Sequence, residues 1–192
     1  MTTILLSYNE VQSVTRKAAS GAGLPHGAAD DIGHAAAWLS ARGVDAVRTV
    51  VDALGDDERG RQTILRDQAA IDTLCCGETE QVLLRDRNYG LLLIGLAGAA
   101  AVHTGLNLAV QQVDGDVVPL ARVSDAGGLL SAMKILRLLP DDDAPVCSGS
   151  LRPMATDAVA YAAALGLAAR TYVPASDLSR ARGAGAGTTD ND

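Results

Sequence analysis

The sequence predicts one α/β domain of the α+β type, in which an N-terminal helical region is followed by a mixed or antiparallel sheet packed with helices. Hydrophobic residues make up 48% of the 192 positions, which is enough for one sizeable core. Helix-start signals gather in residues 1–55, and a hairpin signal lies at Asp114-Gly115. We expect a single domain over residues 1–178, with a helical part at 1–55, a sheet-containing part at 78–178 and a Gly-rich tail at 179–192.

Each of three expected N-terminal helices has its own start signal. The first has a Ser-x-x-Glu capping box, the second has a proline suited to a first helical turn, and the third has an aspartate cap. Glycines mark where the first two stop. The predicted helices run from Ser7 to Gly21 or Gly23, from Pro25 to Gly43, and from Asp45 to Leu54.

The rest of the chain alternates between strand and helix patterns. Residues 56–67 are charged and predict either a polar helix start or a loop. Asp114-Gly115 suits the positive φ angles of a tight primed turn between two strands. The remaining predictions are strands at 81–84, 106–110 and 144–147, a buried helix at 91–103, a helix around 129–139 that Pro140 ends, and a helix that starts at Thr156-Asp157.

Composition narrows the classes of function. With no Phe, one Trp and four Tyr, the core is built from small aliphatic side chains, which favours close packing and a homo-oligomer. The net charge of −7 and the scattered basic residues argue against nucleic-acid binding. No signal peptide, membrane-spanning stretch, disulfide framework or zinc spacing is recognised, so we expect a cytoplasmic protein without a metal site or a cofactor.

The strongest candidate site is the loop around residues 147–157, between an expected strand and an expected helix. Free N–H groups at a helix start attract anions, and Arg can clamp a carboxylate. The expected ligand is a small carboxylate or phosphate, and the alternative is an ordinary strand-to-helix loop. The ligand-binding candidates are Ser148, Ser150, Arg152 and Thr156.

Three residues are candidate catalytic groups, namely Cys147, Asp157 and His34. A cysteine becomes a nucleophile when a base meets it in space, but a buried cysteine is also common as a small hydrophobe. His34 lies about two helical turns from His26, too far for the two to share a metal ion, and a structural role is the alternative. Asp45 and Arg48 form either a site at a helix start or a cap with a surface charge.

The two ends of the chain resemble a bacterial family of unknown function, domain of unknown function 3726. The family implies no reaction. The blocks that carry the resemblance are Leu6–Val11, Arg16–Ala19, Gly21–Pro25, Trp38–Gly43, Tyr172–Ser176, Gly183–Gly185 and Asp190–Asp192.

The first 50 residues are also similar to the N-terminal helices of the malate/L-lactate dehydrogenase family that lacks a Rossmann fold. The local match is Ala41-Arg42-Gly43-Val44-Asp45. Val47 stands where that family has its catalytic histidine, and valine cannot transfer a proton. The resemblance therefore implies similar helices without that chemistry.

Two functions remain open. The first is a small-molecule enzyme or ligand-binding protein for a small anionic metabolite such as an amino or keto acid, held by the loop at Arg152. The second is a non-catalytic subunit or scaffold of a homo- or hetero-oligomeric complex, which the scarcity of histidine and of acid–base pairs favours.

Overall fold

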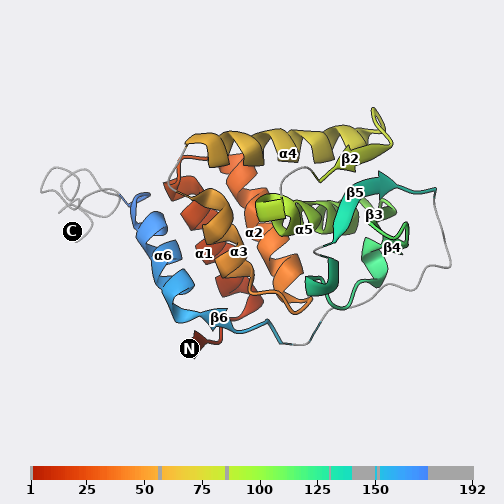
Figure 1. Ribbon diagram of the computed structural model, residues 1–192. Helices are drawn as coiled ribbons and strands as arrows, with labels where there is room; N and C mark the ends of the chain where they lie inside the picture. The colour runs from red at the N-terminus through yellow and green to blue at the C-terminus, as the bar shows by residue number, and fades with distance from the viewer. Residues whose placement is uncertain are drawn as a thin grey trace, which may run out of the picture.

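Helices dominate the computed structural model, which describes residues 2–55, 58–84, 87–129, 131–139, 150 and 152–172. They form a layer around α5, and a small sheet lies at one end (Figure 1). The α+β class is thus confirmed. The strand expected at 144–147, the candidates Cys147 and Ser148, and the tail at 179–192 lie outside the described residues.

The N-terminal helices start where their caps predict. They are α1 (Tyr8–Gly21), α2 (His26–Ser40) and α3 (Ala46–Leu54). At the start of α1, Ser7 Oγ accepts from the backbone N–H of Glu10, and the Glu10 carboxylate accepts from the N–H of Ser7. Asp45 caps α3 by accepting from the N–H of Arg48. Gly23, at φ 95°, turns the chain after α1.

The described part of the charged stretch, residues 58–67, belongs to a helix, α4 (Glu58–Cys76), which carries the chain into a four-stranded sheet. The sheet has the order β2-β5-β3-β4, and every neighbouring pair is antiparallel. The strands are β2 (Gln81–Leu83), β3 (Leu108–Gln112), β4 (Val117–Pro119) and β5 (Ala132–Arg137), and α5 (Arg87–Thr104) lies between β2 and β3 in the chain.

The hairpin expected at Asp114-Gly115 joins β3 to β4, but its turn differs in type from the prediction. Only Gly115 has a positive φ, 95°, whereas both primed turns need a positive φ at the first central residue, which is Asp114 here. The N–H of Gly115 donates to Gln112 O, and the N–H of Gln112 donates to Asp116 O. This is the pattern of a three-residue loop whose last residue, a glycine, adopts the left-handed conformation.

The predicted helix at 129–139 is wrong, because residues 132–137 form β5, at the centre of the sheet. The backbone of β5 pairs with β2 on one side and with β3 on the other. Ile135 is fully buried between its partners Val82 and Val110. Tertiary pairing therefore overrides the helical pattern of this apolar run. Two short 3-10 turns, Leu120–Arg122 and Gly127–Leu129, precede the strand.

The N-terminal strand pairs with a segment from late in the chain. Near the N-terminus β1 (Thr3–Ile4) pairs with β6 (Thr156–Asp157), and α6 (Ala158–Ala169) follows directly and packs on α1 and α3. Figure 1 shows α6 at the outer edge of the helical layer, away from the sheet. Within the described ranges, no helix is long and apolar enough to cross a membrane.

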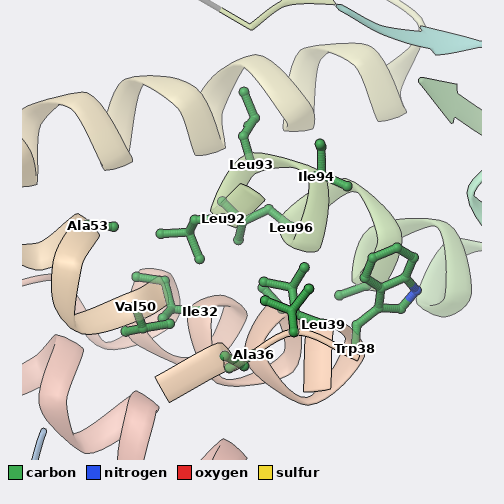
Figure 2. Packing of buried hydrophobic residues seen from close by; sticks show 14 of the residues in the cluster. Ile32, Ala36, Trp38, Leu39, Val50, Ala53, Leu92, Leu93, Ile94 and Leu96 are labelled. Carbon is green, nitrogen blue, oxygen red and sulfur yellow. The ribbon is translucent and has the colours of Figure 1, made fainter. Parts of the chain in front are cut away.

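The core is centred on α5, which contacts α2, α3 and α4 (Figure 2). Leu92 and Leu96 point toward α2, and Leu93 points toward α4. Two glycines on α5 set the distance to α2. A Cβ added at Gly98 would lie 2.2 Å from the Trp38 ring, and one at Gly95 would lie 2.8 Å from Leu39. The glycines that weaken α5 as an isolated helix therefore permit its close packing.

We predict that Gly98→Ala lowers the free energy of unfolding by about 1–3 kcal/mol, because the methyl group would force Trp38 out of its position. The measurement is urea unfolding followed by circular dichroism. Gly90→Ala is the control on the same helix, since no atom of the described residues lies within 4 Å of a Cβ added there. It should leave stability unchanged or raise it slightly. Equal effects of the two substitutions would contradict this account of the α2–α5 contact.

Candidate functional site

The candidate loop lies across the turn that joins α2 to α3. The N–H of Ser150 donates to Ala41 O at 2.8 Å, and the N–H of Met154 donates to Ser40 at 3.1 Å. The Tyr8 hydroxyl donates to Ser150 O at 2.6 Å. Backbone contacts to α1 and α2 therefore hold the described part of this loop in place.

The predicted ligand-binding residues have different environments. Arg152 is exposed, and its N–H donates to Ser150 Oγ at 3.2 Å. Thr156 is only 1% exposed, and it pairs with Ile4 between β6 and β1. A solute would reach Arg152 and Ser150 but not the Thr156 side chain. The anion site therefore stays a prediction that centres on Arg152.

The start of α6 is tied to the start of α3 through two carboxylates. Asp157 accepts from the N–H groups of Val159 and Ala160 at 2.9 and 3.1 Å, and it forms a 3.0 Å ion pair with Arg48. Asp45 caps α3 with one oxygen and accepts from the N–H of Asp157 with the other at 2.8 Å. The structure thus brings Asp45, Arg48 and Asp157 together as paired helix caps.

The electrostatics of Asp157 agree with a structural role. The hydrogen bond from the N–H of Ala160, together with those from Val159 and Arg48, holds the pKa of the Asp157 carboxyl below its ordinary value. The donors that would attract an anion to the start of α6 are therefore already used by the chain's own carboxylate.

A buried arginine lies beneath the same turn. Arg42 is 6% exposed, and its guanidinium carbon is 3.9 Å from the centre of the Trp38 ring. Its Nη1 also donates to Trp38 O at 3.2 Å. Burial raises the pKa of the nearby Tyr8 hydroxyl, while the Arg42 charge opposes that effect. We assign Arg42 to the support of the α2–α3 turn.

The third catalytic candidate, His34, lies elsewhere, on the face of α2 that meets α4 and α5. Its ring makes an edge-on contact with His103 of α5, with 4.6 Å between ring centres. Gln12 Nε2 lies 3.3 Å from His34 Nδ1. The sequence does not predict the pairing of His34 with His103, because only the packing of α2 on α5 brings these two residues together.

The two histidines line a surface recess of about 70 Å³. Partial burial and the nearby Asp72 carboxylate raise the pKa of Asp31. Across the described residues, no three His, Cys, Asp or Glu side chains are placed to hold a metal ion. The recess is lined by Asp31, His34, Gln68, Ile71, Asp72, Leu96, Ala99, Ala100 and His103.

The lowered pKa of Asp157 predicts acid sensitivity. A carboxyl with a depressed native pKa stabilises the fold above its unfolded pKa of about 3.9, and this contribution is lost as pH falls through the native value. Between pH 5 and pH 3 the melting temperature of the wild type should therefore fall more steeply than that of Asp157→Asn, in which the amide still caps α6. Calorimetry across this range measures it, with Asp114→Asn as the control. Parallel curves for wild type and Asp157→Asn would contradict the assignment.

Comparison with known proteins identifies one family. Residues 6–80 match a family described as "Protein of unknown function (DUF3726)". No curated protein and no solved structure matches the chain, and nothing supports the local resemblance to the dehydrogenase family. The matched range runs from just before α1 to just before β2, and it includes Asp45, Arg48 and His34. Over α1–α4 the chain is thus similar to the DUF3726 family of proteins of unknown function.

Proposed function

We propose that this chain is an assembly subunit that associates with a second copy of itself through α6 and the adjoining edge of α3. The supporting observation is the exposed apolar face of α6. No charged residue lies within Ala158–Ala169. Yet the buried residues Ala160, Ala164, Leu167 and Ala168 account for only one side of the helix.

The other side of α6 faces solvent. Val159 is 76% exposed and Leu165 is 46% exposed, and Ala162, Gly166 and Ala169 are exposed between them. A helix that is apolar around its whole circumference is normally covered on all sides. The exposed side therefore supports a packing role, because a contiguous apolar surface rarely faces water without a partner.

A groove between α3 and α6 adjoins this face. It has a volume of about 490 Å³, and Val51, Ala163 and Leu167 are among its lining residues. One acidic and one basic side chain, Asp52 and Arg170, also line it. The groove thus offers apolar area together with one charge of each sign.

These charges favour a second copy of the chain as the occupant. In a two-fold interface the same patch meets itself, so Asp52 of one copy can pair with the partner's Arg170, and the reverse. Small residues on α6 also let two helix backbones approach closely. The same reasoning supports the homo-oligomer that the aliphatic composition suggests.

We predict that Leu165→Glu converts the dimer to a monomer. Leu165 is 46% exposed, so each copy would lose about 0.7–1.5 kcal/mol of apolar burial. A two-fold interface counts the substitution twice, so association should weaken at least about 10-fold. Sedimentation velocity over a range of concentrations measures this. Val102→Glu on α5 is the control, since Val102 is an exposed apolar helix residue (65%) that belongs neither to α6 nor to the groove. A wild type that stays monomeric at every concentration would refute the proposal.

A charge reversal tests the two-fold pairing itself. Asp52→Arg and Arg170→Asp should each weaken the dimer, because each places like charges opposite one another. The double variant should recover association in the same sedimentation experiment. If the double variant is no better than either single one, the two-fold arrangement is wrong.

The second candidate function is the small carboxylate or phosphate ligand at Arg152, which the exposed position of this side chain favours. Thermal-shift measurements with amino acids, keto acids and inorganic phosphate should show stabilisation of the wild type that Arg152→Ala abolishes. Arg122→Ala, another exposed arginine, is the control. A ligand shift unaffected by Arg152→Ala would exclude this site.

A further inference from the structure

We propose that the free edge of β1 pairs with β1 of a second copy, so that the two-stranded sheet becomes a four-stranded sheet across the dimer. The strand order would be β6-β1-β1-β6, with the two-fold axis between the two central strands. This inference deepens the proposed assembly and rests on it, because it names a further contact between the same two copies. Figure 1 shows β1 and β6 at the lower edge of the helical layer, where α6 begins.

One edge of β1 is used by β6 and the other is free. The N–H of Ala158 donates to Thr2 O at 3.0 Å, so β6 takes up the backbone groups of the even-numbered residues of β1. Thr3 and Leu5 therefore direct their N–H and C=O groups away from β6. The N–H of Asp157, opposite Thr3, likewise points away from β1 and donates to the carboxylate that caps α3. No hydrogen bond from the described part of the chain reaches the outward backbone groups of Thr3 or Leu5.

The outer strands of the four-stranded sheet, in contrast, are partly protected against pairing. At β2 the Thr79 hydroxyl donates to Gln81 O at 3.1 Å and accepts from the N–H of Gln81 at 3.5 Å, so it covers the outward groups of that residue. At β4, Pro119 has no N–H to offer. Proteins commonly protect edge strands with proline or charged side chains. Residues 2–6 contain neither, so the free edge of β1 is open to pairing.

An exposed leucine adjoins this edge. Leu5 is 79% exposed, while its neighbours Ile4 and Leu6 pack against the core. Val159, in the first turn of α6, is 76% exposed, and the residue before it is hydrogen-bonded to Thr2. The free edge of β1 therefore lies next to the start of the exposed side of α6, which favours one continuous interface.

The pattern of charge along this edge favours a second copy as the occupant. In an antiparallel pairing centred on Ile4, the N–H and C=O of Thr3 meet the C=O and N–H of the partner's Leu5, and the reverse. The partial charges of the edge thus complement themselves. Residues 2–6 carry no formal charge, so two copies of the edge meet without repulsion between side chains. A strand of two residues is too short to hold two copies together alone, so the pairing adds to the α6 contact.

Disulfide cross-linking tests the pairing. When the strands are centred on Ile4, the two Ile4 Cα atoms lie about 4.5 Å apart, within the range that a disulfide bridges. In a chain whose three cysteines are replaced by serine, Ile4→Cys should form a covalent dimer under mild oxidation. Thr2→Cys is the control, because Thr2 would face the partner's Leu6 rather than the partner's Thr2. Non-reducing electrophoresis measures the cross-linked fraction.

The outcomes separate this inference from the proposed assembly. The expected result is cross-linking at position 4 that Leu165→Glu reduces, because both contacts belong to one dimer. A chain that sediments as a dimer but cross-links no more at position 4 than at position 2 would overturn the β1 pairing and leave the α6 contact standing. A chain that is monomeric at every concentration would overturn both.

A second variant tests the hydrogen bonds themselves. Leu5→Pro removes the N–H that bonds to the partner, and it leaves the pairing of β1 with β6 intact because that N–H points away from β6. Leu5→Ala is the matched control, since it also removes the leucine side chain but keeps the N–H. Leu5→Pro should weaken association about tenfold more than Leu5→Ala does, because each copy loses one hydrogen bond. Equal association of the two variants in sedimentation velocity would overturn the pairing.

Discussion

The close contact between α5 and α2 is the constraint on which the rest of the structure depends. Gly95 and Gly98 let α5 approach α2 so closely that Trp38 and Leu39 fill the space where side chains would otherwise stand. This contact leaves α5 at the centre of the core, with α3 and α4 also against it. It also brings His34 of α2 to His103 of α5. The recess that these two histidines line is thus a consequence of the same packing.

An aliphatic core of this kind relies on close approach rather than on large side chains. Alanine and glycine bury little area each, so their contribution comes from backbone proximity and dense packing. Gly21 permits a second close helix contact, between α1 and α6. A Cβ added at Gly21 would overlap Leu167 O of α6. The inner side of α6 is therefore fixed against α1, while its outer side keeps the same small apolar residues and has no partner among the residues that the structure describes.

Local signals in the sequence predicted the helices well, because caps and glycine stops act within a few residues. Ser7, Asp45 and Asp157 each cap the helix that was expected to follow. The prediction failed at 129–139, where the run is apolar in either conformation and only pairing with β2 and β3 selects a strand. It also missed the pairing of His34 with His103, since contacts between distant helices leave no local pattern.

In the candidate loop, the residue types that favour anion binding are the same ones that favour helix capping. A hydroxyl-rich segment with an aspartate before a helix suits anion binding, and it equally suits a chain that must cap its own helix. Geometry separates the two. The Asp157 carboxylate already occupies the N–H groups of Val159 and Ala160 and neutralises Arg48, so these donors serve the fold.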